Sequence, residues 1–343
     1  EIEPDVSGFT GGWFSVMPLT DMIWSAAFLG KHTDNDRPIE WAKHLNRVMI
    51  NGRHPQTGLD YYYVGVASRQ DYGGPPRATD DTDLTRQSAA RRIYIQWRLA
   101  EMAIAELLGK QGRDMLDWAV TGLKKFAKHA YDPDANAFRF INADGTPAKG
   151  NMTDAHRYFY ANAIGADFPV DAAKAPAHHP ADGAFLLVYA RAWRMSGDDD
   201  LWPTLRAMAA GNGLGDIGQK PGKAMALATD VRRSDPMALL AVLEIYRAQP
   251  ETAYLNLARR IGDNIVANRF VGNLFIEVKG QEYARFDAID PLALLHLEAA
   301  IQGRPGAVPA FIGGAWRYLQ GWDYGDGRRR TTDLRDFYRL PSS

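Results

Sequence analysis

The sequence contains no cysteine among its 343 residues. Without thiols the chain can form no disulfide, no thiolate metal site and no cysteine nucleophile, so three classes of mechanism are excluded together. It also lacks any run close to the roughly 18 apolar residues that a membrane-spanning helix needs. A basic segment followed by an apolar one, the pattern of a secretory leader, is missing too. We therefore expect no contact with a membrane.

The chain has no excess of charge of either sign, with 40 Lys and Arg residues against 41 Asp and Glu residues. A net charge of -1 gives no electrostatic footprint for nucleic acid, so we expect no nucleic-acid partner. Hydrophobic residues make up 46% and charged residues 24% of the chain. That composition is typical of a globular protein with enough apolar material for a large core.

Several common functional motifs are also missing. The sequence has no HExxH, no EF-hand loop and no Gly-x-Ser-x-Gly elbow, so it gives no support to a metalloprotease, a calcium switch or a serine hydrolase. The glycine-dense run 211–218 superficially resembles a phosphate loop. No strand pattern precedes it and the Gly-Lys-Ser/Thr ending is absent, which excludes that reading.

Apolar residues recur at helical spacing in most long segments, and we count roughly ten to twelve such segments. One stripe consists of Ile93, Trp97, Ala100, Ile104 and Leu107. Three helices are expected to end in a polar turn followed by a short extended run, at 61–64, 138–141 and 274–278. This pattern predicts an all-α fold, an α/α toroid or barrel of helix pairs with short β-hairpins in the rim loops. No linker divides the chain, so residues 1–343 are expected to form a single catalytic domain.

The turn after the second helical segment carries the most informative chemistry. Arg53 and His54 lie between a helix and the run Tyr61-Tyr62-Tyr63. A guanidinium can bind a carboxylated ligand, and tyrosine faces are platforms for a sugar ring. Together they indicate an acidic carbohydrate, although Arg-His pairs and tyrosine runs also occur in purely structural turns.

Two further clusters repeat this combination of cations and aromatic rings. His156 is followed by Arg157, Tyr158 and Tyr160, and the third extended run is followed by Tyr283 and Arg285. On one rim of a toroid, the arginines could clamp successive carboxylates while the tyrosines stack on sugar rings. The alternative is that the clusters are unrelated surface loops with no shared function.

Three segments, 211–218, 258–265 and 283–300, resemble the periplasmic pectate lyases, family 2 of the polysaccharide lyases. That family folds as an α/α toroid and cleaves polygalacturonate by β-elimination, with an arginine base beside a metal-ligating histidine. The resemblance implies that Arg53 is the base, His54 a ligand of a divalent metal such as manganese or calcium, and Arg157 a substrate-binding residue. It also implies an acidic polysaccharide or oligosaccharide as partner and a periplasmic or secreted location.

The sequence departs from the family in its metal ligands. The family's other ligands, a histidine and a glutamate, come from helices well before the Arg-His pair, and here about fifty residues precede it. The nearby substitutes are His32, Glu40 and His44. Either N-terminal helix pairs are lacking or the metal site differs.

β-Elimination requires removal of the C5 proton of a uronate, which becomes feasible once a cation neutralises the carboxylate. Arginine is a difficult base because its pKa lies above about 12, so Tyr61 is an alternative base. Two other functions remain open. A glycoside hydrolase of the same fold would use an aspartate pair drawn from Asp80, Asp81, Asp154 and Asp216, and an inactive protein would only bind acidic sugars.

Overall fold

The computed structural model describes residues 13–33, 35–60, 63–65, 87–88, 92–139, 141–147, 178–276, 283–285, 288–311, 321–323, 329–331 and 337–339. The chain separates into two compact units. Unit 1 holds most of residues 1–179, and unit 2 holds most of residues 180–343. Whether the two form one domain stays a prediction. No helix in the described ranges is long and apolar enough to cross a membrane.

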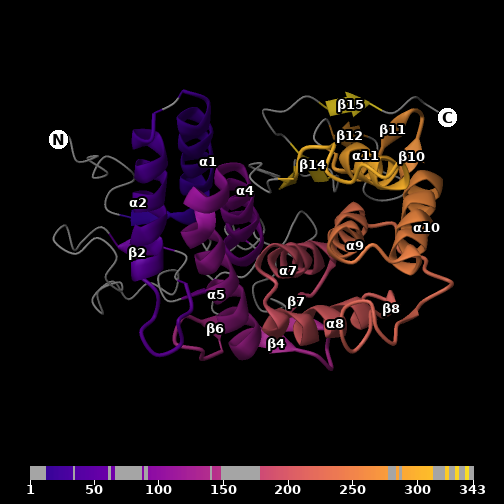
Figure 1. The fold of residues 1–343 in the computed structure, drawn as a ribbon, viewed down its shortest axis with the longest axis horizontal. Coiled ribbons are helices and arrows are strands. Elements are labelled where there is room, and N and C mark those ends of the chain that lie inside the picture. The colour runs from indigo at the N-terminus through magenta and orange to yellow at the C-terminus, as the bar shows by residue number, and fades with distance from the viewer. Residues whose placement is uncertain are drawn as a thin grey trace. The chain divides into compact units, whose positions relative to one another are not determined.

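Unit 1 is built from paired helices, drawn from indigo to magenta in Figure 1. Helix α1 packs against α2 and α4, and α4 packs against α5. A π-helix, η3, leads directly into α4, and a 3-10 turn, η4, joins α4 to α5. The helical elements are α1 (Val16–His32), α2 (Arg37–Asn51), η3 (Arg92–Trp97), α4 (Arg98–Leu108), η4 (Gly109–Gly112) and α5 (Arg113–Ala130).

The core of unit 1 contains a column of aromatic rings. Tyr94 stacks on Phe126 with 3.8 Å between ring centroids, and Phe126 stacks on Phe138 at 4.8 Å. All three side chains have no exposed surface. Because stacked aromatic rings in a closed core have little freedom, the column fixes Tyr94 of η3 against α5.

Unit 2 is organised around α7 (Gly183–Ser196), whose residues are buried from Gly183 to Trp193. A helix that is apolar on all sides lies inside a core rather than on its surface. Asp182 caps its N-terminus by accepting hydrogen bonds from the amides of the first turn, and Gly197 ends it in the left-handed conformation, with φ of 67°. The other helices are η6 (Asp199–Leu201), α8 (Trp202–Gly211), α9 (Pro236–Ala248), α10 (Thr252–Arg269) and α11 (Asp290–Ile301).

The described strands are all two or three residues long and pair antiparallel where a register is given. Two of the three predicted hairpins are confirmed. After α5, β4 (Tyr131–Asp132) pairs with β5 (Ala137–Arg139). After α10, β10 (Phe270–Val271) pairs with β11 (Leu274–Phe275). The first extended run behaves differently, because its strand pairs with one that precedes α1. The remaining strands are β1 (Trp13–Ser15), β2 (Tyr63–Gly65), β3 (Gln87–Ser88), β6 (Ile141–Asn142), β7 (His178–Pro180), β8 (Gly215–Asp216), β9 (Ala226–Leu227), β12 (Tyr283–Arg285), β13 (Gly321–Asp323), β14 (Arg329–Thr331) and β15 (Phe337–Arg339).

Candidate functional site

The Arg53-His54 pair lies in a compact turn that follows α2, as predicted. Helix α2 ends at Asn51, and the amide of His54 donates to the carbonyl of Leu59 at 2.9 Å. The amide of Gly58 donates back to the carbonyl of His54 at 2.7 Å. Gly58 has φ of 70°, a conformation that glycine adopts without strain. The closed turn holds Arg53 and His54 at the end of α2.

Two acceptors from different parts of unit 1 hold the guanidinium of Arg53. Its Nε donates to Oδ1 of Asp60 at 2.8 Å, and its Nη2 donates to the carbonyl oxygen of Trp118, on α5, at 3.0 Å. The side chain of Arg53 is 11% exposed, whereas that of Asp60 is 1% exposed. The guanidinium therefore sits at the edge of the core, with one face anchored inside the protein.

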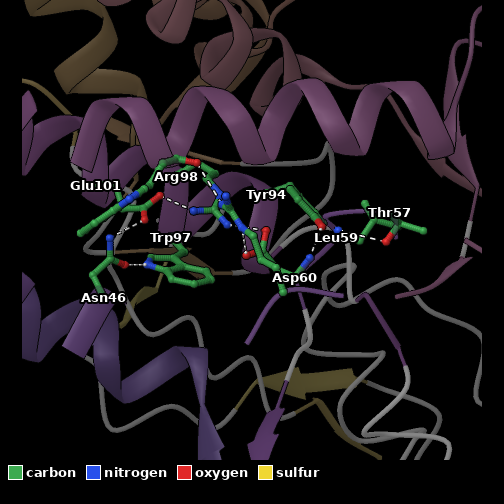
Figure 2. A network of polar contacts seen from close by, with 10 residues as sticks. Asn46, Thr57, Leu59, Asp60, Tyr94, Trp97, Arg98 and Glu101 are labelled. Atoms are coloured by element: carbon green, nitrogen blue, oxygen red, sulfur yellow. Dashed lines mark hydrogen bonds and ion pairs between the residues drawn. The ribbon is translucent and has the colours of Figure 1, made fainter. Parts of the chain in front are cut away.

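Asp60 is the centre of a buried polar network, shown in Figure 2. Its second oxygen, Oδ2, accepts a hydrogen bond of 2.6 Å from Nη2 of Arg98, which has no exposed surface. The amide of Asp60 also donates to the hydroxyl of Tyr94 at 3.0 Å. Both carboxylate oxygens and the backbone amide are thus engaged, so the orientation of Asp60 is fixed.

The network continues behind Arg98 to α2. Nη1 of Arg98 donates to Glu101, whose other oxygen accepts from Nδ2 of Asn46 at 2.7 Å. The amide oxygen of Asn46 accepts from the indole of Trp97 at 2.9 Å. The guanidinium carbon of Arg98 lies 4.2 Å from the centroid of the Trp97 ring, within the range of a cation–π contact. These links join α2, η3 and α4 to one another, and Arg98 connects them to the turn through Asp60.

Charges in this network shift the pKa values of its members in opposite directions. Burial raises the pKa of Asp60, but Arg53 and Arg98 outweigh it, so the pKa of Asp60 lies below the ordinary value. For Glu101 burial is the larger effect and its pKa is raised despite Arg98. The difference follows from the partners, because Asp60 contacts two guanidinium groups and Glu101 only one. The pKa of Arg98 is raised, since Asp60 and Glu101 outweigh the effect of its burial.

Gly122 on α5 leaves the space that the two guanidinium groups occupy. A Cβ atom at this position would lie 2.9 Å from Nη2 of Arg53 and 3.1 Å from Cζ of Arg98. Helix propensity alone makes Gly122→Ala stabilising by about 1 kcal/mol. We expect the opposite result, a loss of about 1–3 kcal/mol in the free energy of unfolding, because a packed ion-pair network must move.

Urea denaturation of the Gly122→Ala variant measures this effect. Gly306→Ala is the matched control, because nothing lies within 4 Å of a Cβ placed there. If Gly122→Ala were as stable as the control variant, the ion-pair network could move without lowering the free energy of unfolding, and the prediction would be wrong.

The other predicted site residues cannot be placed beside Arg53. Most of them lie outside the described residues, namely Tyr61, Asp80, Asp81, Asp154, His156, Arg157, Tyr158 and Tyr160. Tyr283 and Arg285 belong to β12, which pairs with β15, and their backbone is described. They fall in unit 2, whereas Arg53 and His54 fall in unit 1.

His54 is the metal ligand that the sequence predicts in this turn. His54 Nδ1 accepts a long hydrogen bond of 3.4 Å from the amide of Thr57. In the described ranges no group of three His, Asp or Glu side chains converges to hold an ion. His32, Glu40 and His44 are exposed on α1 and α2. The described part of the chain therefore does not supply a ligand set around His54.

Of the four aspartates that a hydrolase could use, the structure describes Asp216. Its carboxylate is paired with Arg206. Nε and Nη2 of Arg206 donate to its two oxygens at 2.6 Å each, and the amide of Gly218 donates to it at 2.8 Å. The hydrogen bonds from Arg206 and then from Gly218 lower the pKa of Asp216 to about 2. A general acid must carry a proton near neutral pH, so Asp216 is unsuited to that role.

Sequence reasoning missed the residues that hold Arg53 in place. Arg98 and Glu101 lie three positions apart on a largely apolar helix, and both are fully buried. Charged residues inside an apolar stripe are the signal that could have found them, because buried charges need partners. Asp60 lies in a polar turn, where an aspartate is ordinary, so nothing in the sequence indicates that it is buried.

Comparison with known proteins adds family-level information. Residues 16–321 match the sequence model of a family described as periplasmic pectate lyase. A pectate disaccharide-lyase of Dickeya dadantii (strain 3937) is 26% identical over 322 residues, which are 88% of this chain and 55% of that protein. The chain thus spans about half the length of this curated relative.

Solved structures resemble the chain in fold. A sugar epimerase from a ruminal bacterium has a TM-score of 0.50 at 12% identity, over 86% of this chain and 72% of that chain. Cellobiose 2-epimerase from Bacillus thermoamylovorans B4167 has a TM-score of 0.48 at 13% identity, over 85% and 71%. The predicted fold class, all-α with the α/α-toroid fold, is confirmed. At such low identities the likeness concerns the fold alone.

Proposed function

The chain belongs to the periplasmic pectate lyase family, and from this membership we propose that it is a polysaccharide lyase that cleaves a polyuronate by β-elimination. Polygalacturonate is the substrate that we propose first. The observation that carries the proposal is the family match across residues 16–321, which includes the anchored Arg53-His54 turn. An acidic polysaccharide also suits a guanidinium held at the edge of the core.

The proposed reaction breaks the bond between C4 of a uronate and the glycosidic oxygen. A base removes the C5 proton, and the electron pair is delocalised into the carboxylate as an enolate-like anion. A cation at the carboxylate stabilises this anion. The electrons then form the C4–C5 double bond, the C4–O bond breaks, and the leaving oxygen takes a proton. The products are a new chain end and a 4,5-unsaturated uronide.

The surroundings of Arg53 bear on its role in this reaction. In both of its described contacts Arg53 is the hydrogen-bond donor, and one acceptor is the ionised carboxylate of Asp60. These contacts hold the guanidinium in one orientation. We propose Arg53 as the base, with Tyr61 as the alternative base. Arg157, Arg285 and the tyrosines 158, 160 and 283 are proposed to bind sugar.

A requirement for a divalent metal stays a proposal based on the family, with His54 as the ligand. Such a cation would neutralise the uronate carboxylate. The described residues do not form its ligand set. We therefore assign no step to the metal. We also propose a periplasmic or secreted location, in keeping with the description of the family.

The proposal is tested by incubating the purified protein with polygalacturonate and following both ultraviolet absorbance and reducing ends. The proposed reaction raises both, because the unsaturated product is conjugated with its carboxylate. A parallel assay with chelator, then with added manganese or calcium, tests the metal. Reducing ends without absorbance would indicate a hydrolase, and neither signal would leave sugar binding as the function.

A further inference from the structure

We propose that Asp60, held from behind by Arg98, is a positioning residue that fixes the tautomer of Arg53 and leaves Nη1 as the nitrogen that takes the C5 proton. The inference rests on the proposed function in taking Arg53 as the base. It goes beyond that function by identifying the atom that receives the proton and the residue that selects it. The selection follows from the contacts of the three nitrogen atoms of Arg53.

The hydrogen bond to Asp60 excludes Nε. A guanidine that acts as a base offers a lone pair on one of its three nitrogens, and its hydrogen bonds decide which one. Histidine follows the same rule, because the bond made by one ring nitrogen sets the protonation of the other. Nε of Arg53 must keep its hydrogen, since it donates to Oδ1 of Asp60 at 2.8 Å.

The surroundings on α5 exclude Nη2. This nitrogen donates to the carbonyl oxygen of Trp118 at 3.0 Å, and a Cβ atom at Gly122 would lie only 2.9 Å from it. Helix α5 therefore covers Nη2. Nη1 has no partner in the described part of unit 1, and the side chain of Arg53 is 11% exposed. Nη1 is thus the nitrogen that can meet a substrate.

The proton transfer then has one defined acceptor. The lone pair on Nη1 forms an N–H bond with the C5 proton while the C5–H bond breaks, and Arg53 becomes a guanidinium cation. The electron pair left at C5 enters the elimination described above, and the proton on Arg53 later passes to water. Asp60 contacts the cation as it forms and stabilises it, as the aspartate of a Ser-His-Asp triad stabilises the imidazolium.

Asp60 can select the tautomer only if its own position is fixed, and Arg98 supplies that support. A carboxylate with a single partner could turn about its side-chain torsions. Here Oδ2 is bonded to Arg98 at 2.6 Å while Oδ1 holds Arg53 at 2.8 Å. One guanidinium lies fully inside the protein and the other at its edge. The carboxylate is therefore a bridge from the core to the proposed base.

The cost of burying Arg98 points the same way. Its Nε is buried without a hydrogen-bond partner in the described structure, although its Nη atoms bind Asp60 and Glu101. Buried ion pairs often stabilise a fold less than apolar residues of the same size would. Stability alone thus gives little reason for a charged group here. A requirement for one fixed orientation and tautomer of Arg53 does.

The local backbone fits a functional role as well. Tyr94 and Trp97 both lie on η3, and Arg98 is the first residue of α4. Single π-helical turns inside helices frequently occur at functional sites. In this structure the hydroxyl of Tyr94 accepts from the amide of Asp60, and the ring of Trp97 contacts the guanidinium of Arg98. Figure 2 shows this group of side chains around Asp60.

The first test separates catalysis from binding in Asp60→Asn. Asparagine has one acceptor oxygen and an amide that donates, so it cannot accept from both guanidinium groups. We expect kcat for the elimination of trigalacturonate to fall about 100-fold. Calorimetry with the unsaturated digalacturonate that the reaction releases should give a dissociation constant within about 2-fold of the wild-type value. A purely structural role for Asp60 would weaken product binding along with kcat.

The second test asks whether Asp60 acts through Arg53. A lysine at position 53 has a single nitrogen, so there is no tautomer to select. In the Arg53→Lys background, Asp60→Asn should therefore lower kcat less than about 3-fold. A loss of the same factor in both backgrounds would show that Asp60 acts independently of Arg53 and would overturn the inference.

Glu244→Gln is the matched control, because Glu244 is also a buried carboxylate between arginines but lies in unit 2. It should leave kcat unchanged at a temperature where all variants are folded by circular dichroism. If Asp60→Asn does not fold, Arg98→Lys replaces it in both tests. A lysine keeps the charge but cannot hold Asp60 and Glu101 together. The loss in kcat is then expected to be about 10-fold or more.

The outcomes separate this inference from the proposed function. If the wild type forms unsaturated product and Asp60→Asn, or its replacement, keeps the wild-type kcat, the positioning role is overturned and the lyase proposal stands. If kcat falls and product binding weakens by the same factor, the role is structural and the inference is overturned as well. A wild-type protein that forms no unsaturated product refutes the lyase proposal, and this inference falls with it.

Discussion

Replacing Arg53 with alanine is expected to lower kcat/KM for the elimination of polygalacturonate about 100-fold or more. The substitution removes the group that we propose as the base for the C5 proton of the uronate. Arg53→Lys should recover only a small part of the rate. A lysine keeps the charge but lacks the planar fork that binds Asp60 and the carbonyl of Trp118 together.

Arg47→Ala provides the control for this experiment. Arg47 is an exposed arginine on α2, six residues before Arg53, and its guanidinium lies 6.0 Å from the centroid of the Trp118 ring. The variant loses the same charge from a nearby position and should keep the wild-type rate. An Arg53→Ala variant with the wild-type rate would remove Arg53 from the reaction.

Glu244→Gln is expected to lower the free energy of unfolding of unit 2 by about 3 kcal/mol at pH 7. Glu244 is 4% exposed and holds two arginines of α7. Nε of Arg191 donates to its Oε1 at 2.7 Å, and Nε of Arg194 donates to its Oε2. Glutamine keeps the shape but removes the anion that both guanidinium groups contact, which is costly for Arg191 because its side chain is only 2% exposed.

The pH dependence of this effect has a definite sign. Burial raises the pKa of Glu244, but Arg191 and Arg194 outweigh it and lower the pKa from 4.5 to about 2. A carboxyl group with a lowered pKa stabilises the fold fully above its unfolded pKa. That contribution is lost as the pH falls from about 4.5 toward 2. The stability difference between wild type and variant should therefore shrink over this range.

Hydrogen exchange of the amides in α7 and α9 reports on unit 2 alone, and urea denaturation at pH 7 and at acidic pH supplies the free energies. Glu298→Gln, an exposed position on α11, is the control and should change little. A Glu244→Gln variant as stable as wild type at pH 7, or a difference that persists undiminished at pH 2, would contradict the role of the ion pairs.

The helices could be predicted from the sequence because their apolar stripes are regular. The stripe through Trp97, Ala100 and Ile104 is buried as expected. Its periodicity did not reveal that the helix begins as the π-helix η3. A π-turn adds one residue to a turn, and a stripe of five residues is too short to register the change of period. Two of the three extended runs were predicted with their hairpins because each directly follows a helix end.

The candidate site was only partly predictable. The Arg53-His54 turn could be located because its residue types suit an acidic ligand. Asp60, Arg98 and Glu101 could not be linked to it, since the contacts join residues up to 55 positions apart. Such pairings depend on tertiary packing, which a single sequence does not display. Asp216 shows the converse case, because a carboxylate that seemed available for catalysis is held by Arg206.

The most direct test of the account is the mass of the products formed from a defined oligogalacturonate. In an elimination no water is added, so the masses of the two products must sum to the mass of the substrate. We predict this result for the wild-type protein and no products above background for Arg53→Ala. Two product masses that sum to the substrate plus one water would contradict the account, because the bond would then have been hydrolysed.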